Sequence, residues 1–406
     1  MVLELAARTY LIKPSPTLSL DAEVKALKAI GKKIVNLGVG EPDFETPEFI
    51  REAAIKAIRD GFTRYTPSEG ILALREAVAH KFKIDNNLDY SPADIVITNG
   101  GKHALYNVMQ ALFSQGDEVI IPIPYWVTYP EQVTLAGATP VFVRTQRANN
   151  YILTPEELES ALTPRTKGLI LNSPANPTGM VYSRENLLGL AAILRKQNIW
   201  VISDDIYEKL IYDGFEFANL PMVAPDLKEQ TVICHGVSKT YSMTGWRIGF
   251  LAGPRKVAQA ITRMQSQMTS NPCSIAQIAG LAALTGPLDS YYQMLNTFNR
   301  RRQLILKLLN EIPGVSVPVP RGAFYAFADI SLFLGTSISG VPINTSDDLA
   351  ALILKKCEVA LIPGTGFGQE GSLRFSYAVS EEEIKEGLER ISHLFSSLVL
   401  KTSKSA

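Results

Sequence analysis

The middle of this 406-residue chain alternates short, apolar, β-branched runs with longer stretches of helical pattern. Strands that are apolar on both faces and separated by helices are typical of a parallel sheet covered by helices on both sides. The candidate strands are 94–98, 118–122, 139–143, 168–172, 200–204 and 231–234, and helix-like stretches between them include 102–113 and 183–196. This alternation predicts an α/β fold with a large, mostly parallel mixed sheet.

The two ends of the chain have a different pattern. A helical run at 21–31 follows a Pro-rich entry, and a long helical pattern spans 256–310. Short segments then precede helices at 346–358 and 380–400, with a strand-like run at 373–377. Because 406 residues exceed what one core usually supports, we expect two domains. Residues 46–310 would form the large domain, while 1–45 (an N-terminal arm and part of the small domain) and 311–406 would form a smaller α+β domain.

Composition excludes several classes of protein. Lys+Arg and Asp+Glu both number 40, so no basic excess indicates a nucleic-acid or membrane-surface partner. The three cysteines and four histidines are scattered, which argues against a disulfide framework and against a metal site. The N-terminus lacks a signal-peptide pattern, and no run has the length of a membrane span. These features predict a cytoplasmic protein without a metal.

Residues 237–249 contain the most informative pattern for chemistry. Lys239 stands among small and hydroxyl residues, and Arg247 follows between Gly245 and Gly249. A lysine in a partly desolvated pocket loses its proton readily and can form a Schiff base with a carbonyl. The fork-shaped, permanently charged arginine suits a phosphate. These are the two anchors that pyridoxal 5'-phosphate needs, although a Lys and an Arg this close more often lie on a solvated face.

Two further segments follow predicted strands. Gly100 and Gly101 precede a helix, so their backbone N–H groups can approach an anion, although a plain strand-to-helix turn explains them equally. The spacing is not that of a Walker loop, and the Gly-rich run 364–368 lacks dinucleotide-binding spacing. Asp204 ends an apolar strand, where it can pair with a pyridine nitrogen or cap a helix. Tyr207 could reach the phenolate oxygen of the same ring.

Three more residues add candidate contacts. Pro174 and Pro177 fix the backbone around Asn176, so its amide can bind a ring hydroxyl, unless the segment is a simple turn. Trp126 could stack on a flat ring or pack in the core. Arg374 points to the strand face opposite Leu373, free to bind a carboxylate or to lie at the surface. Each residue has an ordinary explanation, but together they supply every part of one site.

Motifs along nearly the whole chain resemble the class I, fold-type I pyridoxal-phosphate aminotransferases. The resemblance is to the bacterial and plant branch of aspartate aminotransferases, which also includes prephenate aminotransferases. The motifs are 13–17, 38–44, 64–67, 100–102, 124–130, 172–179, 203–207, 238–249, 321–325 and 374–377. The resemblance implies transamination between L-aspartate and 2-oxoglutarate, giving oxaloacetate and L-glutamate, with activity toward prephenate left open.

The resemblance also implies a role for each matching residue. Lys239 would bind the cofactor covalently and move the proton, with Asp204 and Tyr207 as the other catalytic residues. The phosphate would be held by Arg247, Ser238, the amides at Gly101 and Lys102, and Tyr65 of a neighbouring subunit, which implies a homodimer with shared active sites. Trp126 would stack on the ring, Asp204 would pair with its nitrogen, and Asn176 and Tyr207 would hold its phenolate oxygen.

Substrate-binding roles follow in the same way. Arg374 would bind the α-carboxylate of the amino acid, helped by Trp126, Asn176 and the Gly40 backbone. Lys102, Ser15 and Thr17 are associated with a distal carboxylate, and Lys13 lies in a region linked to prephenate. Two departures from the family pattern are Asp205, where Glu is usual, and His235, where Asn is common. Neither is expected to touch a catalytic group.

Other functions on the same scaffold stay open at this point. The rival enzymes are a carbon–sulfur lyase, an aromatic aminotransferase and a cyclopropane-forming synthase, which fold-level similarity does not separate. A rival of another class is a non-catalytic pyridoxal-phosphate sensor fused to DNA-binding elements. The presence of Lys239 and the lack of basic excess argue against the sensor.

Overall fold

A seven-stranded sheet forms the largest layer of this computed structural model, which describes residues 3–402, and side chains of 3–395. Its strand order is β2-β8-β7-β6-β5-β3-β4. The bounds are Ile95–Thr98 (β2), Glu118–Ile123 (β3), Thr139–Arg144 (β4), Thr166–Asn172 (β5), Trp200–Asp204 (β6), Thr231–Gly236 (β7) and Gly249–Ala252 (β8). All six predicted strands are confirmed. The sequence reasoning missed β8, which runs in the direction opposite to the other six strands of this sheet.

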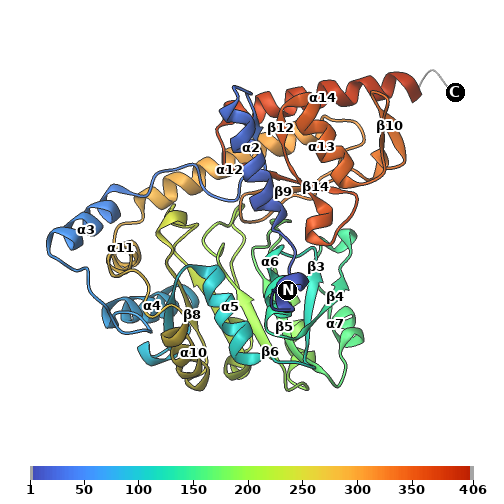
Figure 1. Cartoon of the computed structure of the whole chain (residues 1–406). Helices are drawn as coiled ribbons and strands as arrows, with labels where there is room; N and C mark the ends of the chain where they lie inside the picture. Colours follow the sequence, from blue (N-terminus) through green and yellow to red (C-terminus); the bar gives the residue numbers. More distant parts are fainter. Residues whose placement is uncertain (1–2, 403–406) are drawn as a thin grey trace.

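Helices cover both faces of this sheet (Figure 1). Along β2 the side chains alternate, because successive residues of a strand point to opposite faces. Val96 packs in a core with α5 (Gly101–Leu112) and α10 (Arg255–Met268), whereas Ile95 and Ile97 pack with α4 (Leu72–Asn86) and α11 (Ser274–Thr285). Around β5, the second face is covered by α7 (Pro155–Ala161) and α8 (Arg184–Leu194). The predicted α/β class with a mixed, mostly parallel sheet is therefore confirmed.

Segments from both ends of the chain, among them α2 (Pro16–Ala29) and α14 (Glu381–Thr402), lie above one edge of the large sheet (Figure 1). There β1 (Val35–Asn36) pairs in parallel with β12 (Val359–Ala360), and β9 (Tyr325–Asp329), β14 (Ser372–Ser376) and β13 (Ile362–Pro363) form an antiparallel sheet. A hairpin of β10 (Thr336–Ile338) and β11 (Val341–Ile343) lies nearby. The helices of this region are α2, α13 (Ser346–Cys357) and α14.

The long helical pattern predicted at 256–310 is three helices rather than one. Breaks at 269–273 and 286–288 separate α10, α11 and α12 (Asp289–Asn310). The first break contains Pro272, which cannot donate a helical hydrogen bond, and the second contains Gly286 and Pro287. Only α12 runs toward the small sheets, where Met294, Phe298 and Ile305 pack in one core with Phe324. The remaining helices are α1 (Arg8–Leu11), α3 (Glu48–Arg59), α6 (Thr128–Leu135) and α9 (Leu220–Val223).

The topology of the large sheet decides where side chains can meet. Strands β2, β3, β5, β6 and β7 run in the same direction, so their carboxyl ends share one edge. Ligands of open α/β sheets bind at that edge. None of the helices in the described part of the chain combines the length and apolar character that crossing a bilayer requires.

Candidate active site

A cavity of about 390 Å³ lies at the carboxyl edge of the large sheet, beneath the small sheets. Most of the residues predicted from the sequence line it: Thr17, Gly40, Gly101, Lys102, Trp126, Asn176, Asp204, Tyr207, Ser238, Lys239, Arg247 and Arg374. The strand ends bring these residues together from positions 17 to 374. The chain therefore builds one site from both of its ends and its middle.

Lys239 places an amine in this cavity. It follows β7, and its Nζ donates a hydrogen bond of 2.5 Å to the carbonyl oxygen of Gly40. The pKa of the amine falls from its ordinary 10.5 to about 8, mainly through burial; Glu41 opposes this fall, and the charges of Arg247 and Arg374 add to it. Because only the neutral amine attacks a carbonyl, this environment favours a nucleophilic lysine.

The turn between β2 and α5 forms a site suited to an anion. Gly100 has φ +87°, and a Cβ there would lie 2.4 Å from Nη2 of Arg247. A side chain would therefore displace the guanidinium, whose Nη1 donates to the carbonyl of Thr244 at 2.9 Å. The N-terminus of α5 begins at Gly101, where the helix dipole favours negative charge. Nζ of Lys102 lies 5.0 Å from the ring centroid of Trp126, and burial lowers its pKa.

Asp204 is a buried carboxylate at the end of β6, only 5% exposed. Its Oδ2 accepts a hydrogen bond of 2.6 Å from the hydroxyl of Tyr129, and its Oδ1 accepts one of 3.3 Å from the backbone N–H of Ile206. Burial raises the pKa of Asp204, and these two hydrogen bonds oppose the rise. Nearby, the hydroxyls of Tyr207 and Tyr325 lie 2.9 Å apart.

Arg374 in β14 is 1% exposed, which is unusual for a guanidinium. Its Nη1 donates to Oδ1 of Asn176 and its Nη2 to the carbonyl of Gly38, both at 2.8 Å. Its Cζ lies 4.3 Å from the ring centroid of Tyr325, and its Nε has no hydrogen-bond partner. Within residues 3–395 no carboxylate pairs with Arg374, so its charge can bind an anion in the cavity.

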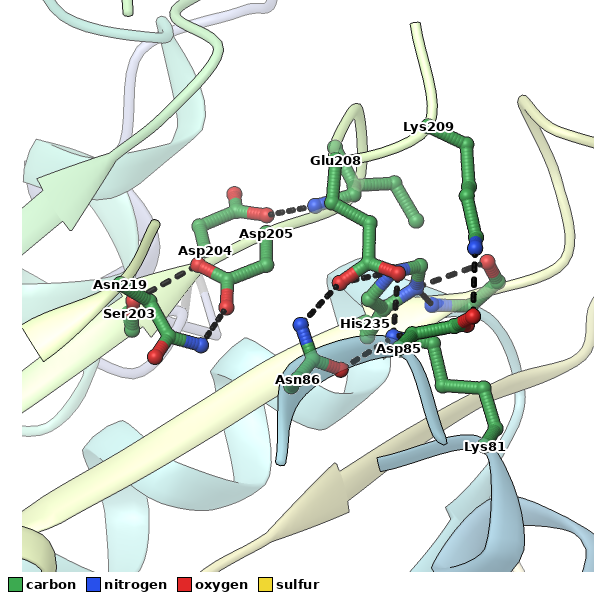
Figure 2. A network of polar contacts seen from close by, with 12 residues as sticks. Lys81, Asp85, Asn86, Ser203, Asp204, Asp205, Glu208, Lys209, Asn219 and His235 are labelled. Carbon is green, nitrogen blue, oxygen red and sulfur yellow. Dashed lines mark hydrogen bonds and ion pairs between the residues drawn. The ribbon is translucent and has the colours of Figure 1, made fainter. Parts of the chain in front are cut away.

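The two departures from the family pattern lie outside the cavity, in the polar network of Figure 2. Asp205 accepts hydrogen bonds from Ser203 at 2.6 Å and from Asn219 at 2.8 Å, and burial raises its pKa to about 7. His235 lies 3.5 Å from Glu208, which also pairs with Lys81. Neither Asp205 nor His235 lines the cavity wall, in agreement with the expectation that they do not touch the catalytic groups.

Three predicted residues do not line the cavity. The hydroxyl of Ser15 lies 2.9 Å from that of Thr17, so it contacts the wall indirectly. The backbone N–H of Lys13 donates to Glu131. Tyr65 is 92% exposed and is not part of the wall of this cavity.

Sequence reasoning missed two tyrosines of the cavity wall, Tyr129 and Tyr325. Both stand inside the motifs 124–130 and 321–325, but no spacing rule connects either of them with Asp204 or Tyr207. Glu41 was missed as well, and its carboxylate accepts a hydrogen bond of 2.6 Å from the hydroxyl of Thr244. In the described range no group of three or more His, Cys, Asp or Glu side chains could hold a metal ion.

The chain belongs to the family Aminotransferase class I and II, whose sequence profile matches residues 32–391. Pyridoxal phosphate is the cofactor that this family implies. The chain is 47% identical over 389 residues to the aspartate aminotransferase of Geobacillus stearothermophilus, covering 96% of this chain and 98% of that protein.

Two further similarities support the same assignment. The probable aspartate/prephenate aminotransferase of Rickettsia bellii is 48% identical over 95% of this chain and 98% of its own length. The crystal structure of the aspartate aminotransferase from Rhizobium meliloti has a TM-score of 0.94 at 42% identity, covering 97% of this chain and 99% of that one. The resemblance seen in the motifs is therefore confirmed.

Proposed function

We propose that this chain is an aspartate aminotransferase that uses pyridoxal phosphate to transfer the amino group of L-aspartate to 2-oxoglutarate. The products are oxaloacetate and L-glutamate. The observation that carries the proposal is that Lys239, Asp204, Arg247 and Arg374 all line one cavity. An amine, a carboxylate and two separate guanidinium groups match a phosphorylated aldehyde together with an amino acid.

The cavity suits the cofactor group by group. Arg247, Ser238 and the backbone N–H groups at Gly101 and Lys102 would hold the phosphate, since Gly100 leaves no side chain between the turn and Arg247. Trp126 would stack on the ring, Asp204 would pair with its nitrogen, and Asn176 and Tyr207 would bind its oxygen. When bound, the cofactor supplies a carbonyl that links to amines and a ring that accepts electrons from Cα.

The chain's own groups perform the remaining tasks. Arg374 binds the α-carboxylate, with Asn176 and the Gly40 backbone, and so orients the Cα–H bond of the amino acid. Lys239, whose amine has a pKa of about 8, would remove the proton from Cα and deliver it to the carbon that was the cofactor's carbonyl carbon. Lys102 would bind the distal carboxylate, with Thr17 and Ser15 beside it, and Lys13 would favour prephenate as a second substrate.

We also propose a larger organisation for the active protein. Residues 46–310 would act as the large cofactor-binding domain, and residues 1–45 and 311–406 as the arm and small domain. Tyr65 would reach the phosphate of a second subunit, which makes the active form a cytoplasmic homodimer. Neither nucleic acid nor a membrane is needed as a partner.

Absorption spectroscopy tests the proposal directly. The purified protein should show a visible cofactor band that L-aspartate converts to the band of the aminated cofactor, with oxaloacetate formed when 2-oxoglutarate is present. A band that aspartate leaves unchanged would retain the cofactor and reject the substrate, and prephenate with glutamate would be tested next. No band after reconstitution would reject the proposal. Pyruvate release from cystathionine without an oxo-acid acceptor would identify a lyase instead.

Substitution of Lys102 tests the distal carboxylate site. Lys102→Ala should raise the KM for aspartate by about 10-fold to about 100-fold, since a charge-assisted hydrogen bond is lost, and change the KM for alanine by less than about 2-fold. Lys256→Ala is a matched control, because Lys256 also lies over a tryptophan, 5.3 Å from the ring centroid of Trp200, but outside the cavity. Equal effects of Lys102→Ala on both amino acids would remove the assignment.

A further inference from the structure

Tyr129 joins two groups that the sequence reasoning treated separately. It is the second residue of α6, and its side chain is 2% exposed. Its hydroxyl lies 2.6 Å from Oδ2 of Asp204, while its ring meets Trp126 edge-on at 5.4 Å and 81°. Tyr129, Trp126 and Asp204 all line the main cavity.

The direction of the hydrogen bond follows from the surroundings of Tyr129. Burial first, and then the charge of Asp204, raise the pKa of the phenol well above 10. The hydroxyl therefore keeps its proton and donates a hydrogen bond to the carboxylate. After burial, this hydrogen bond is the largest influence on the pKa of Asp204, and it lowers that pKa.

The ring of Tyr129 is held firmly in place. It packs in the core between α5 and the sheet, together with Ile170 of β5 and Ile202 of β6. A buried ring in a close-packed core has few alternative rotamers. Its hydroxyl can therefore fix the orientation of the Asp204 carboxylate, because among the described residues that carboxylate has one other hydrogen-bond donor, the Ile206 backbone N–H.

We propose that Tyr129 is a positioning residue that sets the orientation and the charge of the Asp204 carboxylate toward the ring nitrogen of the cofactor. The inference rests on the proposed function. A carboxylate that shares its charge with a phenol attracts the protonated ring less strongly than a free carboxylate does. Tyr129 thereby influences the acidity of the nitrogen that links Lys239 to the cofactor.

The test is a spectroscopic pH titration of the holoenzyme. Tyr129→Phe removes only the hydroxyl, so the Asp204 carboxylate becomes a stronger base that attracts the protonated ring nitrogen more strongly, and the pH midpoint of the visible cofactor band should rise by about half a unit. Tyr182→Phe is the matched control: Tyr182 is 5% exposed, its hydroxyl accepts a hydrogen bond of 3.2 Å from the Leu153 N–H, and it lies outside the main cavity. The midpoint of Tyr182→Phe should equal that of the wild type.

A second variant strengthens the hydrogen bond from residue 129 instead of removing it. Difluorotyrosine at position 129 is a stronger donor, so it should lower the midpoint without removing the contact. A midpoint that stays constant in both variants, or that moves equally in Tyr182→Phe, would overturn the proposal. The titration does not depend on which amino acid is the substrate, so it still tests the role of Tyr129 if the substrate assignment is wrong. A wild-type protein without any visible band overturns both this inference and the proposed function.

Discussion

At the scale of single residues, burial lowers the pKa of the Lys239 amine. Its pKa falls to about 8 because the cavity wall removes water from the charged form. The lysine is therefore half neutral near pH 8, where an exposed lysine would be almost entirely protonated. The lowered pKa of Lys239 is caused mainly by burial and requires no ion pair.

The pH dependence of cofactor uptake should report this pKa. When the apoprotein binds pyridoxal phosphate, the rate of covalent capture should fall about tenfold for each pH unit below about 8, because only the neutral amine reacts, and should level off above it. Stopped-flow absorbance between about pH 6 and about pH 10 measures the rate, with free N-acetyl-lysine as the reference amine. A protein midpoint equal to that of the free amine would contradict the lowered pKa.

Asp205 should make the protein less stable as the pH rises. Burial raises its pKa from 3.8 to about 7, so the folded chain holds the proton more tightly than the unfolded chain does. The stabilisation is complete below about pH 4 and is lost as the pH rises through about 7. Asp205→Asn cannot ionise, so its free energy of unfolding relative to the wild type should gain roughly 2–4 kcal/mol between those pH values.

Urea unfolding at several pH values measures this difference. Asp226→Asn is the contrasting control, because Asp226 is exposed and Arg195 lowers its pKa. The relative stability of Asp226→Asn should therefore not increase with pH. A difference for Asp205→Asn that is independent of pH would show that Asp205 is ionised throughout.

At the scale of elements, the turn from β2 to α5 shows how one glycine determines a binding site. Gly100 combines a positive φ with a close approach to Arg247, and Gly249 lets β8 pass next to the same turn, since a Cβ there would lie 2.4 Å from the backbone of Gly100. The sequence showed the glycines, but their contact joins positions 149 residues apart. The antiparallel strand β8 that creates this contact was not predicted.

Two glycine substitutions separate backbone strain from the loss of the anion site. Gly100→Ala and Gly116→Ala both place alanine at a positive φ, +87° and +94°, but a Cβ at Gly116 has no atom within 4 Å. Both should lose about 1–3 kcal/mol of stability. Only Gly100→Ala should also weaken pyridoxal-phosphate binding, by about tenfold or more, because Arg247 is displaced.

Thermal unfolding of the apoproteins and fluorescence titration with the cofactor measure the two effects. Equal cofactor affinity of the two variants would mean that Arg247 does not need Gly100 for its position. Weakened binding in Gly116→Ala would attribute the effect to strain alone.

At the scale of the whole molecule, the proposed role of Tyr65 in a second subunit can be tested. Tyr65 is 92% exposed and does not line the main cavity of its own chain. If it completes the phosphate site of a second subunit, the two sites of a homodimer are shared. In a symmetric dimer, each chain would supply its Tyr65 to the partner's phosphate site and receive the partner's tyrosine at its own site.

Mixed dimers should reveal this sharing. At limiting cofactor, Tyr65→Ala should have little activity, and Lys239→Ala should have none. Mixed dimers of the two contain one site with both Lys239 and Tyr65 intact, so random exchange of equal amounts should restore about a quarter of wild-type activity. Assays after refolding together test this, with the two proteins mixed without subunit exchange as the control. No gain over that control would mean that Tyr65 acts within its own chain or not at all.

The sequence by itself determined the alternation of strands and helices, because apolar periodicity is a local property that burial enforces. It also indicated which side chains to propose for the chemistry, since Lys239, Arg247, Asp204 and Arg374 each stand in a recognisable local motif at a strand or turn. These residues line the predicted cavity because parallel strands place their carboxyl ends at a common edge.

Tertiary structure alone decided the rest. The hydrogen bond between Tyr129 and Asp204 spans 75 residues, and the contact between Arg374 and Asn176 spans 198. The lowered pKa of Lys239 also depends on burial by distant segments rather than on its neighbours in sequence. No local pattern encodes such pairs, because their distance depends on how the helices pack on the sheet. Local sequence therefore supplied the candidate side chains, and packing determined the distances between them and their pKa values.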